Sequence, residues 1–165
     1  MARTKEQKKE IVAKVEEILK GATSVFVHFT GITVNQESTM RRALRGEGLG
    51  YMVAKKTLIR RALNNLGHTE ELPLEGEVAV AYTASSDDET AAARRIHGFG
   101  KELGEGKLTI LGGLFGGKLV DAKSMQEIAT IPSMDTLRGM FANVINSPRA
   151  RFAVALSEVA KTKSA

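Results

Sequence analysis

Hydrophobic residues follow two different periods along this chain, and the switches between them outline its elements. Continuous or alternating apolar runs indicate strands, and apolar residues three and four positions apart indicate helices. Capping pairs such as Thr4 with Gln7 and Thr33 with Gln36 mark helix starts. The predicted order is helix 4–20, strand 24–29, helix 34–45, strand 51–54, helix 58–66, strand 78–82, helix 88–103, strand 108–111, strand 118–120, helix 124–129, helix 133–145 and a last helix beginning at Pro148.

This order predicts an α/β (α+β) fold: an open mixed sheet flanked by helices and followed by an extended C-terminal helix. Residues 24–29 are almost continuously apolar, as in a central strand buried on both faces. We expect a globular domain over 1–132 and a C-terminal helical segment over 133–165. Asn146-Ser147-Pro148 should interrupt that segment, with a hinge near 146–148, because proline suits the first turn of a new helix.

The last predicted helix carries an apolar face for which the sequence offers no covering segment. Phe152, Ala155, Leu156 and Val159 share that face. Because short lone helices are marginal in water, the face either folds back on the globular domain or binds a partner helix. The residues alone leave both alternatives open.

Positive charge is concentrated in the first 65 residues. They hold 13 lysines and arginines against 6 acidic residues, whereas residues 66–146 hold 7 against 12, and the whole chain has a net charge of +5. A basic N-terminal part suggests a polyanionic partner, and nucleic acid is favoured over a membrane because the chain has no tryptophan to anchor it.

The densest group of phosphate-binding side chains lies where the 51–54 strand passes into the following helix. Lys55 and Lys56 stand at the junction, and Thr57, Arg60 and Arg61 fall on the helix face opposite the apolar residues. The unpaired N–H groups of a helix N-terminus also favour an anion. A solvated helix face is the alternative interpretation.

Two further groups of cations occupy compatible positions. Lys5, Lys8 and Lys9 lie in the first turns of the N-terminal helix, where cations are unfavourable and therefore suggest an external anion. Arg41 and Arg42, with Arg45, are predicted to project from the 34–45 helix. Three basic groups in one small domain favour phosphate binding.

No pattern of catalytic, cofactor-binding or metal-binding residues stands out. Gly112 to Lys118 has the spacing of a phosphate-binding loop, but Leu119 replaces the magnesium-binding hydroxyl residue, and Gly116-Gly117 reads as a hairpin turn. His28, His68 and His97 are scattered without partners, and there is no cysteine. An α/β enzyme acting on a nucleotide or phosphorylated substrate is therefore the weaker hypothesis, and we expect no enzyme activity, no cofactor and no small-molecule substrate.

The chain also lacks the features of a membrane or exported protein. No apolar run approaches the length of about 20 residues that spans a bilayer. The first five residues contain no apolar signal core. A cytoplasmic location is expected.

Several motifs, in order and over almost the whole chain, resemble the family of bacterial large-subunit ribosomal protein ten, which lies at the base of the ribosomal stalk. The matching stretches are Gly31-Ile32-Thr33-Val34, the run from Val53 to Ala62, Gly112-Gly113, and Ile128-Ala129-Thr130-Ile131-Pro132 before a long terminal helix.

The resemblance implies a protein with two binding ends. In that family an α/β N-terminal domain binds large-subunit ribosomal RNA at the GTPase-associated region, beside a neighbouring large-subunit ribosomal protein. A C-terminal helix carries dimers of the acidic stalk protein, which recruit translational GTPases, and free copies of some members repress translation of their own messenger RNA. Carried over by position, the RNA-contact candidates are Gly31, Lys55, Thr57, Arg60 and Arg61, and the stalk-protein face is Phe152, Ala155, Leu156 and Val159.

Two positions depart from the family pattern. Lys56 stands where the family usually has asparagine, and Phe29-Thr30 stands where an aromatic-arginine pair is common. A point charge thus replaces an amide that could read a base edge, so we expect more of the affinity to come from phosphate contacts. A regulatory RNA-binding protein without a stalk role is a third hypothesis, which the unpartnered terminal helix disfavours.

Overall fold

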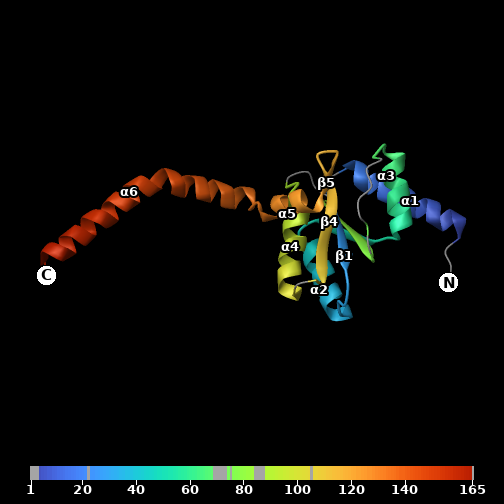
Figure 1. Ribbon diagram of the computed structural model, residues 1–165, viewed down its shortest axis with the longest axis horizontal. Coiled ribbons are helices and arrows are strands. Elements are labelled where there is room, and N and C mark those ends of the chain that lie inside the picture. Colours follow the sequence, from blue (N-terminus) through green and yellow to red (C-terminus); the bar gives the residue numbers. More distant parts are fainter. Residues whose placement is uncertain are drawn as a thin grey trace. The chain divides into compact units, whose positions relative to one another are not determined.

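The computed structural model describes residues 4–21, 23–68, 74, 76–83, 88–104 and 106–164. The chain divides into two compact units between Ile131 and Pro132. In chain order the elements are α1 (Lys5–Gly21), β1 (Ser24–Phe29), α2 (Val34–Gly46), β2 (Leu49–Val53), α3 (Lys56–Asn65), β3 (Val78–Thr83), α4 (Ala91–Leu103), β4 (Leu108–Phe115), β5 (Lys118–Asp121), α5 (Ala122–Thr130) and, in the second unit, α6 (Met134–Ser164) (Figure 1).

The described strands form one sheet in the order β2-β3-β1-β4-β5. The α/β class with flanking helices is confirmed, but the expected mixture of strand directions is wrong, because every neighbouring pair is antiparallel. The reason is that β3 inserts between β1 and β2. The strands joined through α2 therefore run in the same direction without being neighbours, as in a split β-α-β unit.

Helices cover both faces of this sheet. Phe26 of β1 packs with α1 and α3 on one face, and Val25 and Val27 pack with α2, α4 and α5 on the other. These β1 side chains are fully buried, which confirms the prediction of a central strand covered on both faces. The two apolar layers hold the ends of the strands and the helix starts in fixed positions.

Local capping fixes most helix starts. Both predicted capping boxes are present: the Gln7 N–H donates to Thr4 Oγ1 (3.4 Å), and Thr33 and Gln36 exchange the corresponding bonds. Helix α5 begins at Ala122, two residues before the start predicted at Ser124. Asp121 is the capping residue, and its carboxylate accepts from Ser124, which lowers the pKa of Asp121 below its ordinary value.

Helix α4 begins at Ala91, three residues after the predicted start at Asp88. The Asp88 carboxylate accepts from the Thr90 N–H (3.1 Å) and the Thr90 hydroxyl (2.9 Å), which holds these residues in a turn before the helix. Asp88 therefore lies in the turn that precedes α4 and not in the helix itself.

The double-glycine stretch is a strand and a hairpin. β4 continues through Gly112 and Gly113, and Gly116 and Gly117 form the turn to β5 with φ of 55° and 75°. This confirms the rejection of a phosphate-binding loop. A Cβ at Gly113 would lie 2.4 Å from the carbonyl oxygen of Ser24, so glycine is required for β4 to approach β1 there.

In the second unit, α6 is one helix of 31 residues with Pro148 inside it. The predicted interruption at Asn146-Ser147-Pro148 is therefore wrong. Proline removes the hydrogen bond to the carbonyl four residues earlier and its ring crowds that carbonyl, so a helix can bend at such a site and continue beyond it. The ribbon of α6 changes direction about midway (Figure 1). Among the described residues, no helix combines the length and the apolar character needed to cross a membrane.

Candidate nucleic-acid interface

The predicted basic groups meet at one end of the sheet because of its topology. β1 and β2 are both antiparallel to β3, so their C-terminal ends lie on either side of the start of β3, with His28 opposite Val78 and Val53 opposite Ala79. The segments that follow these two strands, Thr30-Gly31 and Lys55-Lys56, therefore leave the sheet at the same end.

A pocket of about 620 Å³ lies at this end of the sheet, beside the first turn of α3. Lys8 of α1 reaches it from one side, and Lys55, Lys56 and Thr57 line it from the start of α3. Lys55 is the N-cap residue of α3 and makes no side-chain cap hydrogen bond, so its side chain accepts none of the N–H groups of the first turn. The remaining described lining residues are Phe29, Val53, Ala54, Leu58, Gly76, Glu77 and Val78.

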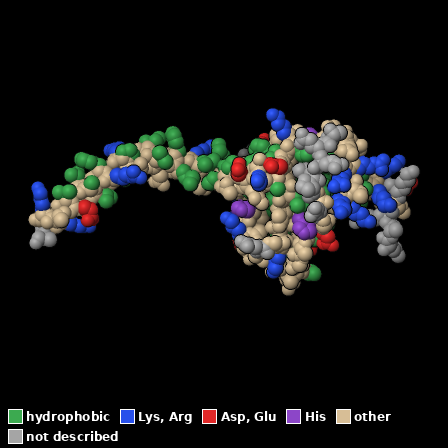
Figure 2. Space-filling model, viewed as in Figure 1, with side chains coloured by type: hydrophobic (Ala, Val, Ile, Leu, Met, Phe, Trp, Pro, Cys, Tyr) green, Lys and Arg blue, Asp and Glu red, His purple; other side chains and the backbone are tan. Residues whose placement is uncertain are grey.

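The basic surface continues beyond this pocket over α1 and α3. Lys9, Arg60 and Arg61 are exposed on these two helices, which the Asn65 side chain connects by donating to Glu16 Oε1 (2.6 Å). Figure 2 shows Lys and Arg side chains gathered over α1 and α3. The side chain of Lys5 lies outside the described residues.

Gly31 follows β1 at the same end of the sheet and is exposed, with φ of 65°. No atom lies within 4 Å of the position that a Cβ would take, so a backbone can approach it closely. Gly31 is not among the residues that line the pocket.

Arg41 and Arg42 lie on α2, against the opposite face of the sheet from α1 and α3. Arg42 is exposed, but the half-buried Arg41 donates to Glu37 Oε1 (2.6 Å) and lies 4.9 Å from the centre of the Tyr51 ring. Burial, offset in part by Arg41, raises the pKa of Tyr51 to about 12. The structure therefore does not bring Arg41 and Arg42 together with the α1 and α3 cations.

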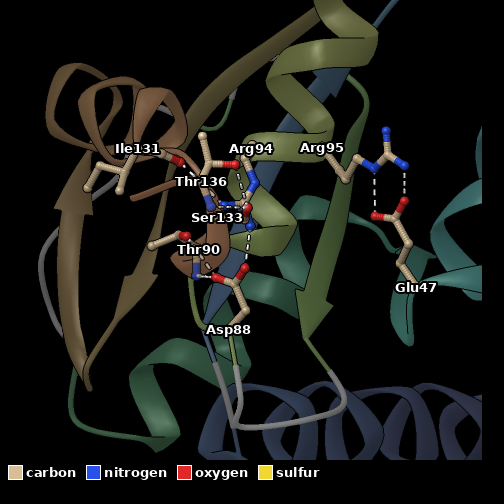
Figure 3. Close-up of polar contacts among 8 residues, drawn as sticks. All are labelled: Glu47, Asp88, Thr90, Arg94, Arg95, Ile131, Ser133 and Thr136. Atoms are coloured by element: carbon tan, nitrogen blue, oxygen red, sulfur yellow. Dashed lines mark hydrogen bonds and ion pairs between the residues drawn. The ribbon is translucent and has the colours of Figure 1, made fainter. Parts of the chain in front are cut away.

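Two arginines of α4 are also engaged within the globular unit (Figure 3). Arg94 forms an ion pair with Asp88 and donates to the Ile131 carbonyl (3.4 Å). Arg95 pairs with Glu47 of the α2 end. These cations tie the elements of one face together, in contrast to the exposed cations of α1 and α3.

The described residues contain no cluster of three or more side chains suited to a metal ion. His28 has a structural environment: its Nδ1 donates to the Glu77 carbonyl oxygen (3.0 Å), and its Nε2 contacts the Thr30 hydroxyl (2.8 Å). Both ring nitrogens are thus occupied, so His28 has a structural role at the end of β1.

Helix α6 exposes apolar side chains along most of its length, and Figure 2 shows them spread over it. The predicted partner face is exposed, with fractions of 66% for Phe152, 55% for Leu156 and 54% for Val159, and Ala155 is exposed beside them. A second exposed apolar group precedes Pro148 and was not assigned to partner binding from the sequence. It consists of Met134, Leu137, Met140, Phe141, Val144 and Ile145.

No local sequence signal marks Val53 or Glu77 as site residues. Val53 reads as an ordinary strand residue, and Glu77 precedes a strand in an acidic part of the chain. They reach the pocket only because β3 inserts beside β2. The first apolar group of α6 could have been recognised from the sequence as a partner-binding surface, because its residues have helical spacing and no predicted segment covers them.

Comparison with known proteins gives concordant matches. A family model described as ribosomal protein L10 matches residues 3–101. The large ribosomal subunit protein uL10 of Fusobacterium nucleatum is 35% identical over 162 residues, which cover 94% of each chain. The protein of the same name from Staphylococcus aureus (strain JH9) is 35% identical over 161 residues, covering 96% of this chain and 94% of its own.

Proposed function

Because the chain belongs to the ribosomal protein L10 family, we propose that it forms the base of the large-subunit stalk, with RNA bound by the globular unit and stalk-protein dimers bound by α6. Membership of the family makes the chain a structural component of the large ribosomal subunit, not an enzyme. In bacteria that subunit lies in the cytoplasm, and its association with ribosomal RNA follows from the same membership.

The observation that carries the RNA half of the proposal is the meeting of Lys8, Lys55 and Lys56 at one pocket. Exposed cations that converge from two helices can contact several phosphates at once, and such contacts dominate nucleic-acid affinity. We assign the ribosomal RNA of the GTPase-associated region to this surface. It comprises Lys5, Lys8, Lys9, Gly31, Lys55, Lys56, Thr57, Arg60 and Arg61.

Arg41 and Arg42 have a subordinate place in this interface. Arg41 would have to leave Glu37 and the Tyr51 ring to reach a phosphate, and Arg42 projects from the other face of the sheet. A strand of RNA that passes the end of the sheet could contact Arg42 through one phosphate while the cations of α1 and α3 bind the neighbouring phosphates. The same surface could bind the messenger RNA in autogenous repression.

The proposal for α6 is supported by its exposed apolar residues. An exposed apolar patch of this extent is typical of a protein-binding surface. Residues 147–165 add 4 lysines and arginines against 1 acidic residue, which suits an acidic partner. Dimers of the acidic stalk protein would bury Phe152, Ala155, Leu156 and Val159 as an amphipathic helix does in a groove.

We extend the docking surface to the first half of α6. The 31 residues of α6 correspond to a helix about 46 Å long. Its two apolar groups, 134–145 and 152–159, flank Pro148. Two docking segments therefore fit the helix, one for each of two stalk-protein dimers.

Leu156→Asp in the full chain tests whether RNA and the stalk protein bind to separate parts of the molecule. An aspartate in a buried apolar contact should abolish binding of a stalk-protein dimer to the second segment, while affinity for the ribosomal RNA fragment stays unchanged. Ser157→Asp is the matched control, because it adds the same charge one position away from the proposed face. Equal losses for both variants, or loss of RNA binding with Leu156→Asp, would refute the assignment.

A further inference from the structure

We propose that the pocket beside α3 holds one unpaired nucleotide of the bound RNA, with its base inside the pocket and its phosphate at the lysines. The inference rests on the proposed RNA-binding function and adds the chemical identity of what enters the pocket. The pocket lining differs in two respects from a surface that contacts phosphates alone.

The first difference is that much of the lining is apolar. Phe29, Val53, Ala54, Leu58 and Val78 line the pocket together with the lysines, and Val53 is 41% exposed. A phosphate gains nothing from apolar contacts, whereas the two faces of a nucleobase do. The volume of about 620 Å³ falls within the range of about 300–1,000 Å³ that small-molecule pockets occupy.

The second difference is that the lining carries a negative charge. Glu77 is exposed and supplies the one carboxylate among the described residues that line the pocket. An ionised carboxylate is an acceptor only and repels a phosphate, but it accepts hydrogen bonds from the N–H groups on the edge of a base. The edge of an unpaired guanine presents two adjacent donors, so guanine is the base that Glu77 suits best.

The wall that carries Glu77 is held in place by its neighbours. The Glu77 carbonyl oxygen accepts from His28 Nδ1 (3.0 Å) and from the Phe29 N–H (3.3 Å). A Cβ at Gly76 would lie 2.3 Å from His28 Cε1, so the backbone at Gly76 passes directly against the imidazole ring. Both contacts fix this wall relative to β1, and a pre-formed wall reduces the entropic cost of binding a base.

The charges at the rim complete the arrangement. Lys8 stands on α1, and Lys55 and Lys56 stand at the start of α3, so the ammonium groups approach from two elements. They can neutralise the 5′-phosphate of the inserted nucleotide and that of its neighbour. A base inside and phosphates at the rim is the pattern by which proteins hold single-stranded RNA.

The test is a titration of the ¹⁵N-labelled full chain with guanosine 5′-monophosphate, uridine 5′-monophosphate and ribose 5-phosphate, followed through backbone amide shifts. The amides of Ala54, Thr57 and Glu77 should shift with guanosine monophosphate, and its affinity should exceed that of ribose 5-phosphate at least about fivefold. Uridine monophosphate should bind between the two. Equal affinity for ribose 5-phosphate and both nucleotides would reduce the pocket to a phosphate site and overturn the proposal.

Glu77→Gln separates the two interpretations by the direction of its effect. If the carboxylate reads a base, the variant loses about fivefold in affinity for guanosine monophosphate and loses nothing for ribose 5-phosphate. If the pocket receives only phosphate, the variant binds both compounds more tightly, because a repelling charge is gone. Glu127→Gln on α5, which packs on the opposite face, is the matched control and should change neither affinity.

The same variants, measured with a ribosomal RNA fragment of the GTPase-associated region, distinguish this inference from the proposed function. If the fragment binds with unchanged affinity to Glu77→Gln while the nucleotide titration fails, the nucleotide pocket is refuted and RNA binding stands. If the full chain does not bind the fragment at all, the proposed function itself fails.

Discussion

Replacing Lys55 and Lys56 together by glutamine should make RNA binding markedly less dependent on salt. Both side chains are exposed and line the pocket at the start of α3. Cations at a helix N-terminus oppose the helix dipole, so their removal should leave the thermal stability equal or slightly higher. If the measured melting temperature is equal or higher, a loss of RNA affinity in this variant cannot be attributed to unfolding.

The magnitude follows from counterion release. Each phosphate contact contributes roughly 0.7–0.9 to the slope of the logarithm of affinity against the logarithm of salt concentration, so two lost contacts reduce the slope by about 1.5. The ratio of variant Kd to wild-type Kd should then fall about eightfold between about 50 mM and 200 mM salt. Lys56 should account for about half of this change.

The assay is fluorescence anisotropy with a labelled ribosomal RNA fragment over a series of salt concentrations. The matched control replaces Lys118 and Lys123 by glutamine, which removes the same charge near β5, at the other edge of the sheet from β2. Only a long-range effect of net charge should remain in that control. A slope that changes equally in both double variants would refute specific phosphate contacts at the start of α3.

Three further results follow from the structure. Gly76→Ala should lower the free energy of unfolding by about 1–3 kcal/mol in urea titrations, because the backbone has φ of +66° and the added Cβ meets the His28 ring. Gly98→Ala should raise the free energy of unfolding by about 0.5–1 kcal/mol, because Gly98 lies inside α4 and no atom lies within 4 Å of the position that its Cβ would take. The raised pKa of Tyr51, about 12, favours its neutral form in the folded state, so the free energy of unfolding should fall as the pH rises from about 10 to 12. The fall should be smaller in Tyr51→Phe, and identical plots of unfolding free energy against pH for the two proteins would contradict this. Pro148→Ala should restore a backbone hydrogen bond within α6 and increase the helical circular dichroism signal, and an unchanged or weaker signal would mean that proline does not perturb this helix.

Local chemistry made much of the fold predictable. The pairs Thr4 with Gln7 and Thr33 with Gln36 mark helix starts because a side chain and a backbone N–H three residues apart complete the cap. The Gly116-Gly117 turn was predictable for the same reason, since only glycine readily adopts both positive φ angles.

Three features of the structure differ from the sequence-based prediction. The insertion of β3 between β1 and β2 made the sheet antiparallel throughout, and strand order carries no local signal. Pro148 reads as a helix start, yet the surrounding residues continue the helix through it. Arg41 has the sequence pattern of an exposed cation, but Glu37 and the Tyr51 ring engage it.

The cations of the candidate site could be predicted from the sequence, but the pocket beside them could not. Lys55 and Lys56 were identifiable from the junction of strand and helix, because position along one element determines their exposure. Lys8 and Glu77 reach the same pocket from α1 and from the start of β3, and only the folded chain brings them together.

Truncation after Pro132 tests the two-ended account most directly, because it removes α6 and retains the unit that ends at Ile131. The full chain and the truncated chain would each be titrated with the ribosomal RNA fragment and with the acidic stalk protein. The account predicts unchanged RNA affinity and complete loss of stalk-protein binding, with partial retention in a chain that ends at Asn146. Loss of RNA binding on removal of α6, or stalk-protein binding that survives it, would contradict the account.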